Sequence, residues 1–466
     1  MGEDIKTSGF SEADFARFSE RLVRETELAR AMFDDGCFSN SDETQIGFEL
    51  EAWILDHNYF PAPINESLLR ALDHPLVVPE LSRFNVELNA VPLLLEGDVF
   101  ARAERALTKL WSHCNAVAHG LDANMVMIGT LPTIRNADMT LENISPLNRY
   151  YALNNEVLRQ RAGRPLRVDI SGRDHLVSEH RDVMLEAATT SFQVHLKIPA
   201  SRAHLYYNAS VAASGPILAA CANAPFLFGK SLWEETRIPL FEQAVDAPCK
   251  GRRVSMGSGY VSNSCMELFE ENLADYPVLL PMSFDEVPAA LRHLRLHNGT
   301  IWRWNRALIG SDDDGTPHLR IEHRILPAGP TILDMIANAA LYVGLAHDLA
   351  SSGAARELSF DAALKNFYSA ARDGLSAELY WPGASPRTAR ELLLALLLPA
   401  ARRGLEDLGV TAGPYLDVIE ARVSSGQTGS AWQRAALGHR GGDVYRMMAA
   451  YCERQRSGAP VHEWEP

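Results

Sequence analysis

The sequence lacks several features that mark common classes of protein. None of its six cysteines forms a C-x-x-C pair, which argues against a zinc site or a disulfide scaffold and favours reduced thiols in a cytoplasmic protein. No G-x-x-x-x-G-K-[ST] motif occurs, so no Walker-type phosphate loop is expected. The N-terminus has no apolar stretch typical of a secretory signal. The longest apolar run near the C-terminus, LLLALLLPAA, is too short to cross a bilayer and is interpreted as a buried helix.

The sequence also has fewer basic than acidic residues. Lys and Arg total 44 against 59 Asp and Glu, which gives a formal net charge of −15. Such a surface repels nucleic acid and anionic membranes, and no large basic patch offsets it. We therefore expect small-molecule substrates as partners, with no nucleic acid and no membrane, and the sequence leaves a homo-oligomer open.

Three regions follow one another along the 466 residues. Residues 1–40 predict a helical segment with Ser11 as its N-cap. Residues 41–350 mix strands with helices over about 98–118, 148–161 and 201–220, which predicts an α+β core. Residues 351–466 are rich in Ala and Leu and predict a helical C-terminal region with no further strong strand.

The first strand, QIGFELEAWILD, alternates strictly between apolar and other residues. Period two predicts a half-buried strand, so Glu49 and Glu51 share one face, about 6.6 Å apart at roughly 3.3 Å per residue. A solvated strand face explains such a pair simply. A cation site is the alternative, because hard divalent cations prefer carboxylate oxygens.

Further strands repeat this design of one apolar face and one polar face. RFNVELNAVPL carries Glu87, and Glu80 stands seven residues before it. TSFQVHLKIPA carries Gln193, His195 and Lys197. GTIWRWNRALIG and HLRIEHRIL flank a Gly-containing turn and predict a hairpin that bears Arg320, Glu322 and Arg324.

Each of these polar residues has a structural explanation when taken alone. A strand histidine is often hydrogen-bonded within the fold, Glu80 could cap a turn, and Arg324 could belong to an ordinary ion pair. Packed as neighbours in one sheet, however, the carboxylates would repel one another unless cations neutralised them. The joint pattern therefore favours an acidic site that binds cations.

The motifs IGFELEAW, ELSRFNVELN, TSFQVHLKIP, GTIWRWNR and LRIEHRILPAGPTILD together resemble those of the glutamate-cysteine ligase family, second type, which includes bacterial carboxylate-amine ligases. The resemblance runs from about Gln45 to Ala346. It implies a glutamine synthetase-like core, with a mainly antiparallel curved sheet flanked by helices.

The resemblance also implies roles for individual residues. Glu51, Glu80 and Glu87 would bind one Mg²⁺, and Glu49, His195 and Glu322 another, with Mn²⁺ as a substitute. Arg324 and Arg306 would be catalytic and face the transferring phosphoryl group. Gln193, Lys197 and Arg320 would bind ATP. In the Gly-rich segment CKGRRVSMGSGYVSNS, Arg253 and Tyr260 would hold the acceptor amino acid, although they are one residue further apart than in the family loop.

The implied reaction is ATP- and Mg²⁺-dependent ligation of a carboxylate, by resemblance the γ-carboxylate of glutamate, to cysteine or another amine through an acyl phosphate. Two alternatives stay open. One is a phosphotransferase that uses the same superfamily fold. The other is a non-catalytic regulatory protein that binds nucleotide; loss of a metal ligand would favour it, and all six ligand positions are filled here.

Overall fold

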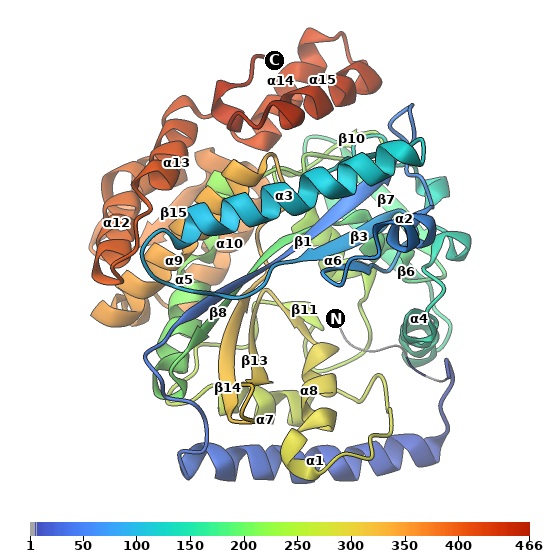
Figure 1. Cartoon of the computed structure of the whole chain (residues 1–466), viewed down its shortest axis with the longest axis vertical. Helices are drawn as coiled ribbons and strands as arrows, with labels where there is room; N and C mark the ends of the chain where they lie inside the picture. The colour runs from blue at the N-terminus through green and yellow to red at the C-terminus, as the bar shows by residue number, and fades with distance from the viewer. Residues whose placement is uncertain (1–4, 6) are drawn as a thin grey trace.

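The alternating strands expected from the sequence pair as one curled antiparallel sheet (Figure 1). The computed structural model describes residue 5 and residues 7–466. Its strands are β1 Gln45–Leu55, β2 Val77–Pro79, β3 Asn85–Asn89, β4 Leu93–Leu94, β5 Asn124–Val126, β6 Leu166–Ser171, β7 His175–His180, β8 Phe192–Ile198, β9 Phe226–Leu227, β10 Lys230–Ser231, β11 Val254–Ser255, β12 Trp302–Arg303, β13 Asn305–Ser311, β14 Pro317–His323, β15 Glu378–Trp381 and β16 Ala384–Thr388.

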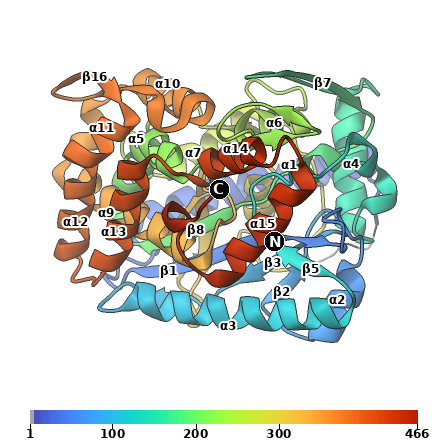
Figure 2. The ribbon, with the colours of Figure 1, turned by 90° about the horizontal axis from the view of Figure 1, so that it is seen from above.

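Helices cover the sheet and form the outer layers (Figures 1 and 2). They are α1 Glu12–Asp34, α2 Asn65–Leu72, α3 Val99–Gly120, α4 Asn148–Gln160, α5 Ala203–Cys221, α6 Arg237–Ala244, α7 Met266–Asp275, α8 Arg292–Gly299, α9 Ile332–Ser352, α10 Phe360–Asp373, α11 Ala389–Leu392, α12 Leu398–Asp407, α13 Gly413–Ser425, α14 Gly429–His439 and α15 Val444–Ser457. The α+β class expected from the sequence is confirmed.

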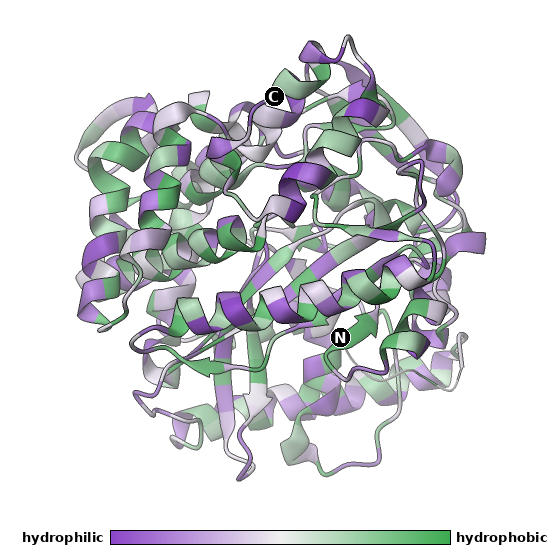
Figure 3. Ribbon diagram, turned by 45° about the horizontal axis from the view of Figure 1, so that its top comes forward, coloured by the Kyte–Doolittle hydropathy of each residue, from purple (hydrophilic) through white to green (hydrophobic). Residues whose placement is uncertain are grey.

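The main sheet has the strand order β13-β14-β8-β1-β3-β2, with every neighbouring pair antiparallel. The apolar residues of β1 form the core face: Ile46, Leu50, Ala52 and Ile54 are fully buried. Phe48 stacks on Phe192 of β8 with ring centroids 5.4 Å apart. In Figure 3 the strands accordingly alternate between hydrophilic and hydrophobic colours. This alternation leaves the polar residues of neighbouring strands side by side on the other face.

The first helix begins as the sequence predicts. Ser11 caps α1 in a capping box with Asp14, in which each side chain bonds to the backbone of the other residue. Phe18 and Leu22 are buried, so one face of α1 packs against the protein. In Figure 1 this helix runs along the bottom of the molecule, beneath α7 and α8.

The hairpin arm GTIWRWNRALIG is not the single strand that the sequence predicts. Its first part, β12, pairs in parallel with β11, and only β13 pairs with β14. Trp304 lies between them, where its backbone N–H donates to Ser255 and its indole N–H donates to the buried carboxylate of Glu242. These tertiary contacts interrupt the strand, which the local pattern cannot reveal.

Three further hairpins were not expected from the sequence, and the shortest joins β9 to β10. The segments of β6 and β7 form an antiparallel pair, and β15 and β16 form another within the C-terminal region that was expected to contain no strong strand. Both β15 and β16 are short and largely exposed, so they lack the long apolar alternation that identifies a buried strand.

The apolar run LLLALLLPAA is helical, as expected, and contains one π-helical turn at Leu393–Leu397 between α11 and α12. The helix in the described residues whose length and composition could span a membrane is instead α9. Its most apolar window is 89% buried inside the molecule, which is the environment of a core helix.

The C-terminal helices are fastened to the core by buried polar contacts. Arg422 of α13 donates to Asp334 and Asn338 of α9 at 2.8 and 2.6 Å. Gln455 and Tyr451 of α15 bond to the backbone of Met127 beside β5. In Figure 2, α14 and α15 accordingly lie across the middle of the protein.

Candidate active site

On the polar face of the sheet, several predicted site residues lie side by side across neighbouring strands. Arg306, Glu322, His195 and Gly47 stand directly opposite one another on β13, β14, β8 and β1. Residues that face one another in an antiparallel pair point to the same side of the sheet. The strand register therefore carries an arginine, a carboxylate and an imidazole to one place.

The first carboxylate group consists of Glu49, His195 and Glu322. His195 Nε2 lies 3.0 Å from Glu49 Oε1 and 3.8 Å from Glu322 Oε1, and one candidate ligand atom from each residue lies within 4.8 Å of the other two. Two carboxylate oxygens and an imidazole nitrogen at this spacing suit a divalent cation. The donor set thus fits one of the two predicted magnesium positions.

Basic side chains beside this first group keep its carboxylates ionised. Burial opposes the ionisation of Glu49, but the adjacent His195 lowers its pKa to about 2. Burial also opposes the ionisation of Glu322, whose pKa is nevertheless lowered by Arg306 and Arg324. Both carboxylates are therefore charged at neutral pH and available to a cation.

The second group contains Glu51, Glu80 and Glu87. Glu51 faces Glu87 across β1 and β3, and Glu80 lies close enough to Glu87 to share a hydrogen bond. Burial and the charges of Glu87 and Glu51 raise the pKa of Glu80 well above its ordinary value. Carboxylates crowded in this way are stabilised by a divalent cation, which replaces repulsion with oxygen ligation.

Glu186 joins the second group, although the sequence did not single it out. It lines one small cavity with Glu51, Glu80 and Asn85. Burial, and then the charge of Glu51, raise the pKa of Glu186 to about 8. Glu186 lies on a short 3₁₀ helix, Met184–Ala188, so neither strand nor helix periodicity marks it.

A hydrogen-bonded bridge connects the two groups. Arg324 Nη1 donates to Gln193 Oε1 at 2.6 Å, and Gln193 Nε2 donates to Glu51 Oε1 at 3.0 Å. Arg324 also lies 3.2 Å from Glu322 of the first group. The structure thus places Arg324 between the two candidate cation positions.

Arg306 holds the other side of Glu322. Its Nε and Nη2 atoms donate to both carboxylate oxygens, at 2.7 and 3.0 Å. Its Nη1 donates to the carbonyl of Gly299, at 3.2 Å, at the end of α8. Arg306 is therefore fixed by two independent partners beside the first group.

Two cavities open beside the carboxylate groups and meet at Arg320. The first, of about 650 Å³, is lined by Glu49, His195, Lys197, Asp312 and Arg320. The Lys197 ammonium lies 2.7 Å from Asp312, in the turn between β13 and β14. Lys197 and Arg320, both predicted to bind the nucleotide, therefore line one polar cavity.

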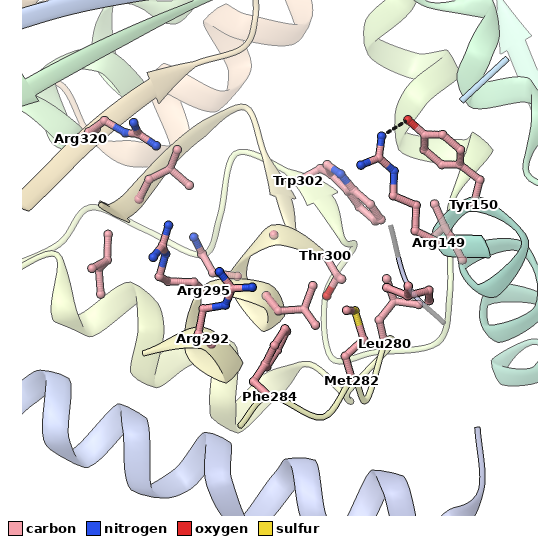
Figure 4. Close-up of a pocket in the computed structure, with 17 residues that line it drawn as sticks. Arg149, Tyr150, Leu280, Met282, Phe284, Arg292, Arg295, Thr300, Trp302 and Arg320 are labelled. Atoms are coloured by element: carbon pink, nitrogen blue, oxygen red, sulfur yellow. Dashed lines mark hydrogen bonds between the residues drawn. The ribbon is translucent and has the colours of Figure 1, made fainter. Parts of the chain in front are cut away.

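The second cavity, of about 580 Å³, is lined by four arginines: Arg149, Arg292, Arg295 and Arg320. We call it the arginine cavity (Figure 4). Phe284 and Trp302 belong to its apolar wall. Within the described chain, no carboxylate forms an ion pair with Arg295 or Arg320 within 4.0 Å. Burial and the positive charges of Arg292 and Arg320 lower the pKa of Arg295. Such a cavity favours an anionic ligand.

The sequence pointed to only one of these four arginines, Arg320. Arg149 belongs to α4, and Arg292 and Arg295 belong to α8, so each resembles an ordinary residue on a polar helix face. Only the packing of α4 and α8 around one space reveals the cavity. No local signal in the sequence could have identified it.

Arg253 and Tyr260, predicted to bind the acceptor, lie apart from the cavities beside the carboxylate groups. Arg253 is fully buried and donates to the carbonyls of Thr300 and Pro277 at 3.1 and 2.5 Å. The ring of Tyr260 packs edge-on against Phe360, with centroids 5.6 Å apart. Neither residue lines the cavities described above, and their role in binding the acceptor stays a prediction.

Comparisons with known proteins support a ligase of the carboxylate–amine class. Residues 45–450 match the model of glutamate-cysteine ligase family 2. The chain therefore belongs to glutamate-cysteine ligase family 2. The match extends about a hundred residues beyond the resemblance seen in the sequence, which ended near Ala346, and residues 1–44 lie outside it. No curated protein has a sequence that matches this chain.

Two of the solved structures that share the fold are a ligase and a synthetase. A glutamate–cysteine ligase from Francisella tularensis, solved in complex with AMP, has 11% sequence identity and a TM-score of 0.52, with 90% of each chain covered. A bifunctional glutathione synthetase from Pasteurella multocida has 9% identity and a TM-score of 0.53; the match covers 89% of this chain and 52% of that one. At such low identity these likenesses define the fold alone.

Proposed function

We propose that this protein joins a carboxylate to an amine at the expense of ATP, with Mg²⁺ at both carboxylate groups. The observation that carries the proposal is the pair of carboxylate groups on one sheet face, bridged by Gln193 and Arg324. The donor set of the first group and the crowding of acids in the second both fit divalent cations, and Mn²⁺ would fit the same oxygen-rich positions.

In this proposal Glu51, Glu80 and Glu87 hold one ion, and Glu49, His195 and Glu322 hold the other. When bound, the ions neutralise charge on the phosphate oxygens of ATP. The substrate carboxylate attacks the γ-phosphorus, and the bond to ADP breaks. The amine nitrogen then attacks the acyl carbon, phosphate leaves, and the nitrogen loses a proton. These steps conserve atoms and charge without a redox partner.

The arginines supply the remaining electrostatics. Arg324 lies between the two groups, where its guanidinium can follow the phosphoryl group during transfer. Arg306 orients Glu322 through two hydrogen bonds and adds positive charge beside it. Gln193, Lys197 and Arg320 are proposed to contact the nucleotide. Arg320 supports this best, since it faces both cavities without an ion-pair partner among the described residues.

We infer a small acidic carboxylate donor, with glutamate as first choice from the family, and cysteine or another amine as acceptor.

A cytoplasmic location is part of the proposal. It is supported by the six cysteines, all of which carry free thiols, as expected of a reducing compartment.

The test is phosphate release from ATP with Mg²⁺ and glutamate, across a panel of amines that includes cysteine, with mass spectrometry of the products. Amine-dependent phosphate release with a new amide mass is the expected result. A phosphorylated product without an amide would instead identify a phosphotransferase. ATP binding without turnover in any mixture, including other acidic donors, would favour a nucleotide-binding regulatory protein.

A further inference from the structure

Helix α1 and the residues before it contact two elements that line the arginine cavity, α4 and α8. We call residue 5 and residues 7–35 the N-terminal arm. The family match begins at residue 45, so the arm lies outside it. On one side of the cavity, Asn148 of α4 donates to the carbonyl of Ile5, which lines the cavity, at 2.8 Å, and Asn155 donates to the carbonyl of Ser8 at 3.2 Å. The arm is thus fixed to the helix that carries Arg149.

On the other side of the cavity, the arm is fixed to α8. Glu25 Oε2 accepts hydrogen bonds from the backbone N–H groups of His293 and Leu294, at 2.8 and 3.0 Å. Its Oε1 lies 2.6 Å from His293 Nδ1. The side chains of Glu25 and His293 are both buried, at 6% and 2% exposure. A buried carboxylate therefore satisfies the free donors at the start of α8, a role that a residue within the same helix usually fills.

His293 also connects the arm to the cavity wall. Its ring lies edge-on between Phe18 of α1 and Phe284 of the wall, with centroid distances of 5.1 Å to each. Arg21 of α1 donates to the carbonyl of Phe284 at 3.0 Å. Arg21 thus contacts the cavity wall directly, and Phe18 contacts it through His293.

Helix α8 connects these contacts of the arm with the residues of the site. Arg292 and Arg295 project from it into the cavity, and its last residue, Gly299, accepts the hydrogen bond from Arg306. A shift of α8 would move the two cavity arginines together, whereas Arg306 would still be held to Glu322 by two hydrogen bonds. Figure 4 shows α1 as the faint blue helix below these residues.

We propose that Glu25 is a positioning residue, through which the N-terminal arm sets the place of α8 and so the affinity of the arginine cavity for anionic ligands. The inference rests on the proposed function only in taking the cavity ligand to be a polyphosphate such as that of ATP. Glu25 itself touches no ligand, because it faces the start of α8.

The experiment measures binding of inorganic tripolyphosphate and of ATP to the full chain by calorimetry, together with kcat and KM for ATP. Glu25→Ala should raise both dissociation constants and KM about fivefold, with kcat within about twofold of wild type, a range typical of residues that act on a site from a distance. Glu25→Gln keeps an oxygen acceptor and should recover part of the affinity. Glu27→Ala is the matched control, since Glu27 is exposed on the same helix and should change nothing.

Glu25→Ala leaves buried donors and can reduce folding, so Arg21→Ala is the second variant. It removes the contact to Phe284 from an exposed side chain and should weaken tripolyphosphate binding about twofold. Unchanged affinity in both Glu25→Gln and Arg21→Ala would overturn the inference. A lower kcat with unchanged affinity would also overturn it, because a purely structural role predicts that pattern.

The failure of the proposed function is distinguishable from the failure of this inference. If the wild-type protein binds tripolyphosphate but forms no amide, the ligase proposal fails, and the dissociation constants still decide the role of Glu25. If the wild-type protein binds neither tripolyphosphate nor ATP, the arginine cavity is not an anion site and the inference is overturned.

Discussion

Arg306 and Glu322 face each other across β13 and β14 and form a two-pronged ion pair, with both carboxylate oxygens bound at 2.7 and 3.0 Å. The pair is buried, and the carboxylate is shared with the first carboxylate group. The strand register therefore couples a candidate metal ligand directly to a candidate catalytic arginine.

This geometry predicts the effect of Arg306→Lys. Lysine keeps the charge but cannot make the planar two-pronged contact, so kcat/KM for amide formation should fall about 10–100-fold. Phosphate release at varied ATP concentration measures the change, with the melting temperature as a check on folding. Wild-type kcat/KM in a folded Arg306→Lys protein would remove Arg306 from the mechanism.

Glu51→Gln should abolish amide formation without unfolding the protein. The glutamine side chain has nearly the same shape as glutamate and keeps one oxygen that accepts hydrogen bonds from Ser191 and Gln193. The substitution also removes one negative charge from a crowded group of carboxylates. In chelator, its melting temperature should equal or exceed that of wild type. Magnesium should raise the wild-type melting temperature more than that of the variant. An equal shift in both proteins would contradict Mg²⁺ binding at Glu51.

The raised pKa of Glu186 predicts a pH dependence of the metal-free protein. Because its folded pKa, about 8, lies above the ordinary 4.5, the folded state binds the proton more tightly. Its contribution to stability is complete below about pH 4.5 and is lost as pH rises through about 8. Glu49 has the opposite shift, to about 2, so its contribution changes only as pH falls below 4.5.

We therefore expect the free energy of unfolding in chelator to decrease across that window, at most by about 1.4 kcal/mol per pKa unit of the shift. Urea unfolding at pH values on either side of it measures the change. Glu186→Gln should reduce the slope, and Glu80, whose pKa is also raised, should account for part of the slope that remains. The same slope in wild type and variant would show that Glu186 does not titrate in this way.

Arg320→Ala should weaken the binding of ATP about tenfold, since the guanidinium faces both cavities and has no ion-pair partner among the described residues. The loss should shrink at high salt, which screens the attraction. Calorimetric titration with ATP at two salt concentrations tests this. Arg70→Ala is the matched control, because Arg70 is exposed on α2 away from either cavity. Equal affinities for the two variants would contradict a nucleotide contact by Arg320.

The C-terminal region should prove essential to the stability of the core. Arg422 and Asp334 are both fully buried, so Arg422→Ala leaves an uncompensated charge and should lower the free energy of unfolding by about 3–5 kcal/mol. Arg402→Ala, which removes a partly exposed pair with Asp417 and Glu420, should cost about 0–1 kcal/mol. Urea unfolding of both variants compares them. Similar losses would mean that residues 351–466 are not held to the core through Arg422.

Much of the site was predictable because a strand imposes its pattern locally. Period two alone places Glu49 with Glu51 on one face of β1 and His195 on the matching face of β8, and the structure brings these residues to the groups that the motifs predicted. Their role as metal ligands stays a prediction. The N-terminal helix was equally readable, since the Ser11 cap acts within a single turn.

Only the tertiary structure decided the rest. The chain places Arg149 and Arg295 nearly 150 positions apart, and they line one cavity only because α4 and α8 pack around it. Tertiary contacts also buried Arg253 and placed Glu186 beside the second group. The sequence by itself determined which strand faces are polar, since peptide geometry fixes that residue by residue. Which helices enclose those faces depends on contacts between distant segments, and no local pattern encodes them.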